Sequence, residues 1–93
     1  MLKKLITLVA KPGKEQDVLA LIKSMIEPSL AEDGCVLYTA YSESDSPGTI
    51  YLIEGWETAE AVENHKKSSH FLKFKAVASE LLADKSSVSI KEL

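Results

Sequence analysis

The segment from Leu2 to Ala10 most constrains the fold, because it has the composition of a strand and is apolar on both faces. It is rich in Leu, Ile, Thr and Val, and it ends at a Lys-Pro-Gly turn signal. One face carries Leu5, Thr7 and Val9, and the other carries Ile6, Leu8 and Ala10. A sheet with one face in water alternates apolar and polar residues more cleanly. We therefore expect both faces of this sheet to be covered.

The residues from Lys14 to about Ala31 have the pattern of an amphipathic helix. The apolar residues that share one half of its helical wheel are Val18, Leu19, Leu21, Ile22, Met25, Ile26 and Leu30. Pro28 has no backbone N–H to donate, so we expect it to kink or end the helix near Glu27. Gly34 then supplies the stop.

Three further strands are expected. The runs Cys35–Ser42 and Thr49–Trp56 are rich in β-branched and aromatic residues and predict a hairpin, with Pro47-Gly48 marking its turn. The last segment, Ser87–Leu93, alternates apolar and polar residues and predicts a closing strand.

Two short helices are expected between the hairpin and the closing strand. Thr58 can cap one that runs through His65, and Ser68 or Ser69 can cap another from His70 to about Ala83. The order β-α-β-β-α-α-β is the split βαβ, or ferredoxin-like, arrangement of the α+β class. With 93 residues we expect a single domain over residues 1–93. A second copy of the sheet would cover its open face, which predicts a symmetric homodimer.

Composition excludes several classes of partner. Eleven basic and fourteen acidic residues give a net charge of −3, so we expect no binding to nucleic acid. No apolar run is long enough to span a membrane, and the short apolar N-terminal segment lacks a cleavage pattern. Cys35 is the only cysteine, which forbids an internal disulfide. We expect a cytoplasmic protein with no membrane partner.

The stretch NHKKSSHF holds both histidines, five positions apart. On one continuous helix His65 and His70 would point in directions about 140° apart. A helix break at the two serines instead places His65 at the end of one helix and His70 at the start of the next, so both can turn inward. The negative C-terminus of a helix favours an imidazolium and the positive N-terminus disfavours it. We expect His65 to be the easier of the two to charge.

Two interpretations of these histidines remain open on the residues alone. They can form an acid and base pair, or each can be a partly buried packing residue satisfied by a backbone carbonyl. Trp56 and Glu54 share one face of their strand and could line a pocket for a flat aromatic ligand, or Trp56 can be a core aromatic and Glu54 a surface charge. No metal-binding spacing, phosphate-binding loop or dinucleotide fingerprint is present, so we expect no metal.

The sequence resembles the antibiotic biosynthesis monooxygenase domain, a small dimeric ferredoxin-like α+β barrel. The resemblance is carried by KPGKEQDVLALI, EPSLAEDGCVLY and IYLIEGWETAEAVENHKKSSHF, and it covers nearly the whole chain. It implies a homodimer with a pocket in each subunit between the sheet and the helices. It also implies a cofactor-independent monooxygenase that oxidises a quinol-like small aromatic with O₂, since members include oxygenases that need neither metal nor flavin.

The resemblance also implies roles for individual residues. His70 is the first choice for the base, and His65 for proton donor or substrate hydrogen bond. The expected substrate-binding residues are Trp56, Glu54, Tyr51 and Phe71.

Two alternatives to the monooxygenase stay open. A related branch isomerises a phosphorylated autoinducer-2-type sugar derivative, and Lys66, Lys67, Ser68 and Ser69 could hold its phosphate at a helix N-terminus. The chain could also be a non-catalytic dimeric domain that binds a small ligand.

Overall fold

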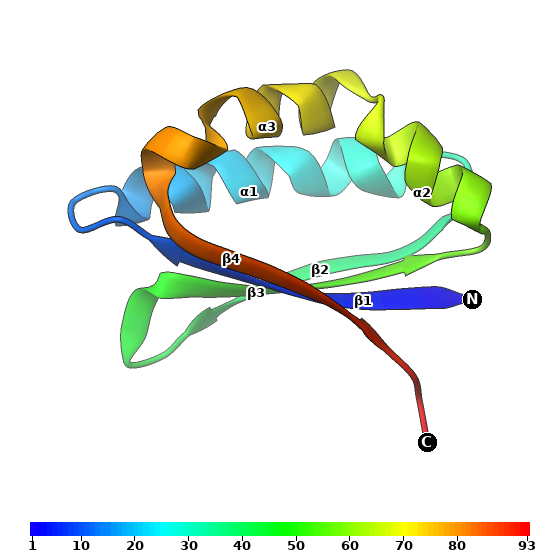
Figure 1. The fold of residues 1–93 in the computed structure, drawn as a ribbon, viewed down its shortest axis with the longest axis horizontal. Coiled ribbons are helices and arrows are strands. Elements are labelled where there is room, and N and C mark those ends of the chain that lie inside the picture. The colour runs from blue at the N-terminus through cyan, green and yellow to red at the C-terminus, as the bar shows by residue number, and fades with distance from the viewer.

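The computed structural model describes residues 1–93 as a four-stranded antiparallel sheet with three helices on one of its faces (Figure 1). In chain order the elements are β1 (Leu2–Ala10), α1 (Glu15–Leu30), β2 (Cys35–Glu43), β3 (Ser46–Trp56), α2 (Ala59–Lys66), α3 (Ser69–Leu81) and β4 (Leu82–Ile90). The predicted order and the ferredoxin-like α+β class are confirmed. None of the three helices combines the length and the apolarity needed to cross a bilayer.

The strands are ordered β2-β3-β1-β4, and every neighbouring pair is antiparallel. Ile6 lies opposite Leu52 and Leu8 lies opposite Ile50, so the even-numbered residues of β1 and β3 point toward the helices. The core forms between this face and the helices. Its most deeply buried members are Leu8, Val18, Ile22, Met25, Tyr38, Ile50, Leu52 and Trp56.

No helix lies on the opposite face of the sheet (Figure 1). The odd-numbered residues of β1 and β3 point to this face, and most of them are apolar or aromatic. At its two edges Tyr41 is 55% exposed and Val88 is 52% exposed. The single chain therefore covers one of the two apolar faces of β1 and leaves the other open.

Helix α1 runs through Pro28 and ends at Leu30, so it does not end near Glu27, one of the two outcomes predicted for Pro28. Pro28 stands in the last turn, where its fixed φ suits a helix and only the hydrogen bond to the Ser24 carbonyl is lost. Gly34 does not end the helix, which already stops at Leu30 with Ala31 as its cap. Gly34 instead has φ +83° in the turn before β2, and a Cβ there would lie 2.7 Å from the Cβ of Ala61.

The hairpin turn lies at Ser44-Asp45 rather than at Pro47-Gly48, which belong to β3. The pairing of β1 with β3 ends at Val9 and Thr49, so Pro47 lies beyond the end of the neighbouring strand. Its missing N–H therefore breaks no bond to β1, and a proline is tolerated there.

Strand β4 runs from Leu82 to Ile90. It therefore begins five residues before Ser87, the start that the sequence predicted. No loop separates it from α3, which ends at Leu81. Residues 83–89 of this edge strand are all exposed. The first half of the strand therefore shows no alternation of apolar and polar residues, and the sequence did not predict it.

The predicted break between the two short helices is confirmed, with Ser68 as the cap of the second. The Thr58 hydroxyl accepts a hydrogen bond from the Ala61 N–H at the start of α2. The Ser68 hydroxyl accepts one from the Phe71 N–H at the start of α3. Capping thus fixes where each helix begins and how the chain turns between them.

Candidate active site

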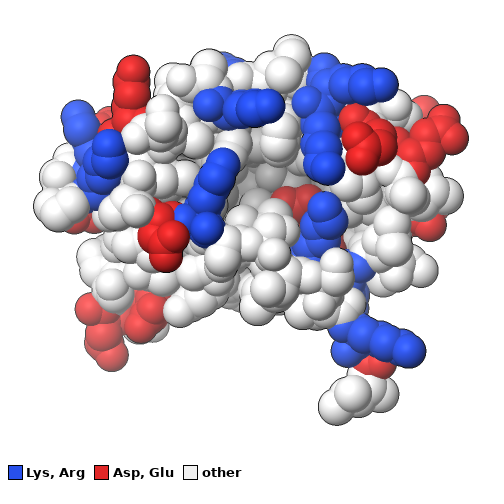
Figure 2. All heavy atoms as spheres, viewed as in Figure 1, with Lys and Arg blue, Asp and Glu red and all other residues white.

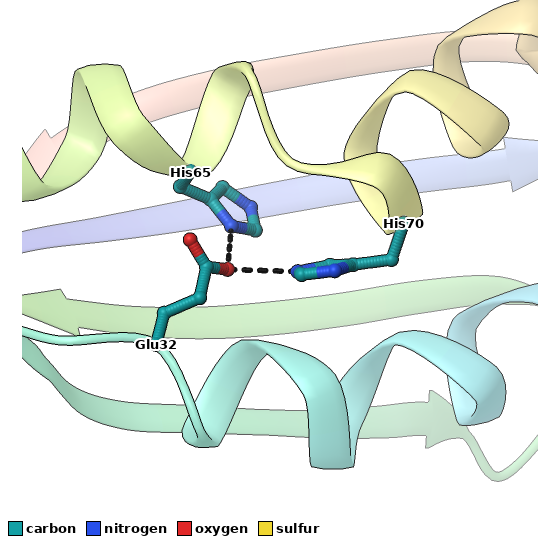
Figure 3. Close-up of side chains that lie close together, drawn as sticks. All are labelled: Glu32, His65 and His70. Carbon is teal, nitrogen blue, oxygen red and sulfur yellow. Dashed lines mark hydrogen bonds and ion pairs between the residues drawn. The ribbon is translucent and has the colours of Figure 1, made fainter.

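His65 and His70 both point at the carboxylate of Glu32, in the connection between α1 and β2 (Figure 3). The Nδ1 atom of His65 lies 2.6 Å from Glu32 Oε2, and the Nε2 atom of His70 lies 2.7 Å from the same oxygen. One carboxylate oxygen therefore joins three segments of the chain. We call Glu32, His65 and His70 the shared-carboxylate cluster.

Ser68 holds the junction that brings the two imidazoles together. Its hydroxyl donates to the His65 carbonyl at 2.7 Å and caps α3 through the Phe71 N–H. It also lies 3.2 Å from His70 Nε2. The break in the helix thus turns both rings to the same side, as its capping serine predicts.

The bond to Glu32 determines the tautomer of each neutral imidazole. An ionised carboxylate oxygen accepts hydrogen bonds and cannot donate them. His65 must therefore carry its proton on Nδ1 and His70 on Nε2. The remaining nitrogen of neutral His65, Nε2, then keeps its lone pair and can accept a proton.

Aromatic rings surround His65, which is 3% exposed. The centroid of its ring lies 4.6 Å from that of Trp56, 5.2 Å from Phe71 and 5.9 Å from Tyr38. Behind it, the Trp56 Nε1–H donates to the buried carboxylate of Glu54 at 2.9 Å. These contacts fix the plane of the imidazole.

A cavity of about 390 Å³ opens between the sheet and the helices, next to this cluster. Figure 2 shows a hollow at the centre of this face of the molecule. His65, Phe71, Tyr38 and Glu54 line the cavity, and nine of its sixteen lining residues are hydrophobic. His70 and Trp56 are not among them, so of the two histidines only His65 reaches the cavity.

The structure brings five of the six predicted site residues to one place. His65, Phe71 and Glu54 line the cavity. Trp56 packs against the His65 ring, and His70 binds the same Glu32 oxygen as His65. Tyr51 lies elsewhere: its side chain is on the open face of the sheet, where its hydroxyl donates to Glu43 at 2.9 Å. The reason is strand alternation, since Tyr51 is three residues from Glu54 and so points to the opposite face.

Glu32 is the residue of the candidate site that the sequence did not predict. It lies 33 residues from His65 and 38 from His70, and its side chain is partly buried although it follows a helix end. Its only local signal is a carboxylate two residues before the left-handed Gly34. That signal is indistinguishable from the one given by Asp33, which is exposed.

Two groups near the cluster have raised pKa values. Burial, and then the nearby Glu54 carboxylate, raise the pKa of the Tyr38 phenol well above its usual value. Burial, and then Glu32, raise the pKa of the Cys35 thiol. The Ser29 hydroxyl opposes the shift at Tyr38, but neither hydroxyl has a partner at good hydrogen-bond geometry. Tyr38 therefore stays a neutral phenol with its donor unused.

The shared-carboxylate cluster is also the one group of side chains that could hold a metal ion, since its donor atoms lie within 4.8 Å of one another. Two histidines and a glutamate are a known zinc ligand set. Ligands about 2.0 to 2.1 Å from a tetrahedral ion are, however, roughly 3.3 Å apart. The observed separations of 2.6 and 2.7 Å are those of hydrogen bonds, so this arrangement fits two imidazole protons better than a metal.

Known proteins are similar to this chain in sequence and in fold. The family model for antibiotic biosynthesis monooxygenases matches residues 1–77. The chain belongs to this family. The protein named "Putative monooxygenase Rv0793", from Mycobacterium tuberculosis, is 34% identical over 80 residues, which are 86% of this chain and 78% of that protein.

Two further proteins are similar to this chain, one in its crystal structure and one in its sequence. The crystal structure of PA3566 from Pseudomonas aeruginosa superposes with a TM-score of 0.95 at 28% identity, over 99% of this chain and 93% of that one. An uncharacterised protein of Synechocystis is 29% identical over 83 residues, or 89% of this chain. The match spans only 56% of that cyanobacterial protein, about half of its length.

The shared carboxylate predicts a distinctive pair of histidine tautomers. Long-range ¹H–¹⁵N correlation spectra at neutral pH should show neutral His65 protonated on Nδ1, the less common tautomer, and neutral His70 protonated on Nε2. In Glu32→Gln a neutral amide oxygen replaces the charged carboxylate oxygen and accepts more weakly. The spectra of both histidines should then show a mixture of the two neutral tautomers. Glu27→Gln, which changes an exposed carboxylate near the end of α1, is the matched control. A wild-type His65 protonated on Nε2 would contradict the geometry.

Proposed function

We propose that the protein is a cofactor-independent monooxygenase that oxidises a quinol-like small aromatic with O₂. The observation that carries the proposal is the position of His65. Its ring lines an apolar cavity while its Nδ1 atom is bound to Glu32. An imidazole held in this way has a free nitrogen available to remove a proton from a bound substrate.

The base in this proposal is His65, and His70 is a positioning residue. His70 was the first choice from the sequence, but it does not line the cavity, and its Nε2 atom is bound to Glu32. His65 Nε2 takes the proton of a substrate hydroxyl, and the imidazolium that forms is stabilised by the adjacent Glu32 carboxylate. His70 fixes the carboxylate through its second bond. This is the arrangement of a base oriented by a carboxylate.

The oxidation itself needs only the substrate anion and O₂. Deprotonation gives an electron-rich anion, which transfers an electron to O₂ and then forms a carbon–oxygen bond at a ring carbon ortho to the oxygen. Loss of water from the resulting hydroperoxide leaves a carbonyl. A hydroquinone and O₂ thus become a hydroxyquinone and water. One atom of the O₂ enters the hydroxyquinone and the other leaves in the water.

The surroundings of His65 suit this reaction. The apolar cavity wall excludes water from the anion and the hydroperoxide. Phe71 supplies an aromatic surface beside the base. Glu54 can accept a second substrate hydroxyl through the oxygen that Trp56 does not use.

Family membership and the name of the mycobacterial relative support a monooxygenase.

The phosphate site that an isomerase would need has less support, since the Ser68 hydroxyl is engaged with His65 and Phe71. The lone free cysteine agrees with the cytoplasmic location that the sequence predicts, and we keep that location in the proposal.

Oxygen uptake with a panel of hydroquinones and anthrones tests the assignment. His65→Gln should lower kcat by roughly 10² or more, the usual range for loss of a general base. His70→Gln leaves the base in place and should lower it less, by roughly tenfold. His70→Gln should also change the pH profile, because Glu32 then has one imidazole partner. Wild-type turnover in His65→Gln would contradict the proposal.

The same experiment separates the two alternatives. Turnover of a phosphorylated sugar derivative without oxygen consumption would indicate the isomerase. Reaction with neither class of substrate, in a protein that still binds small aromatics, would indicate a non-catalytic binding domain.

We also propose that two copies pair through the open faces of their sheets. The support is the uncovered apolar face of the single chain, where Leu5, Val9, Tyr51 and Ile53 are only partly buried. Burying apolar surface is favourable by about 25 cal/mol per Å², and a symmetric dimer of facing sheets covers the face completely. In this dimer the Tyr51 side chain, which lies on the open face, would be buried in the interface.

Sedimentation should give about twice the chain mass of 10.2 kDa. Ile53→Glu, on the open face, should shift the protein toward the monomer because it places a charge in the interface. Glu60→Lys, an exposed charge change on α2, is the control and should leave the mass unchanged. A monomeric wild type at micromolar concentration would contradict the dimer.

A further inference from the structure

The cavity beside His65 is more positive than the protein that contains it. The whole chain has a net charge of −3. The charged residues of the cavity lining, histidine aside, are three lysines, Lys4, Lys66 and Lys85, and one carboxylate, Glu54. Lysines also stand on both sides of the hollow in Figure 2. A local reversal of charge at a cavity raises the concentration of anions there.

Two of these three lysines have a carboxylate that offsets their charge. Lys66 pairs with Glu63 at 3.6 Å. Lys4 lies directly opposite Glu54 on the neighbouring strand, on the same face of the sheet. Neither Lys4 nor Lys85 forms a salt bridge. The residue opposite Lys85 on β1 is Leu8 and not a carboxylate, and the neighbouring Asp84 accepts from the Lys85 backbone N–H. The Lys85 ammonium is therefore less compensated than that of Lys4.

Lys85 stands beside a hydroxyl and next to the apolar floor of the cavity. Lys85 and Ser87 are two residues apart on β4 and so share one face. They lie opposite Leu8 and Ile6 of β1, and all four residues line the cavity. An ammonium and a hydroxyl together offer donors for the two oxygens of a carboxylate. The apolar floor beside them suits an aromatic ring.

We propose that the substrate is an aromatic acid, whose carboxylate binds Lys85 and Ser87 while its ring lies over the apolar floor toward His65. The inference rests on the proposed function, because it names the class of quinol that the same cavity takes. It gives a role to the polar residues that β4 contributes to the cavity lining, Lys85, Ser86 and Ser87. The acid group orients the ring without contacting the base.

A binding experiment tests this without any turnover. The probes are 2-naphthoate and its neutral isostere 2-naphthamide, which have the same ring and differ in charge. Calorimetric titration at low salt should give a lower Kd for naphthoate. Lys85→Gln should weaken naphthoate binding about fivefold, the scale of one partly exposed ion pair, and should leave naphthamide unchanged. Added salt should weaken naphthoate binding alone.

Matched variants make the result specific. Lys23→Gln removes an exposed lysine of α1 that does not line the cavity, and it should bind both probes as the wild type does. Ser87→Ala should cause a smaller loss for naphthoate only. His65→Gln should still prefer naphthoate, because the acid group does not contact His65.

The outcomes separate this inference from the proposed function. Equal Kd values for the two probes, absence of binding by both, or a preference that survives Lys85→Gln would overturn the acid-binding site and leave the oxygenase proposal standing. A Lys85-dependent preference in a protein that consumes no oxygen with any quinol acid would support the acid-binding site and count against the oxygenase.

Discussion

The site depends on one carboxylate oxygen. Glu32 Oε2 accepts hydrogen bonds from both imidazoles and so ties the end of α1 to α2 and to the start of α3. Removing one partner of such a network leaves the other group without its bond inside a partly buried site. The carboxylate also determines which nitrogen of each ring is protonated. The position of the helices and the chemistry available to His65 therefore have the same cause.

The two histidines are not equivalent in this arrangement. His65 lines the cavity, and Trp56 and Phe71 lie against its ring. His70 binds the same carboxylate oxygen but is not among the lining residues. In the proposed function, His65 therefore meets the substrate and His70 supports it. The proposed oxidation of an aromatic acid rests on three features together: the apolar cavity, a base with a free nitrogen, and the lysine and serine that β4 adds to the cavity lining.

Local patterns in the sequence predicted most of the fold and part of the site. Element order followed from periodicity, and the serine cap at Ser68 predicted that both imidazoles turn inward. Glu32 could not be found, because its contacts cross more than thirty residues and nothing local separates it from Asp33. The errors at Pro28 and Pro47 arose because a proline is tolerated in a last helical turn and beyond a neighbouring strand's end. Tyr51 was misplaced although alternation from Glu54 already put it on the other face.

The central claim is that His65, held by Glu32, is the group that meets the substrate. The most direct test is a crystal structure of the protein soaked without oxygen in a hydroquinone that it turns over. We predict a substrate hydroxyl within about 3 Å of His65 Nε2, with His65 Nδ1 and His70 Nε2 still bound to Glu32. A hydroquinone whose hydroxyl contacts His70 instead, or that binds away from both histidines, would contradict the account.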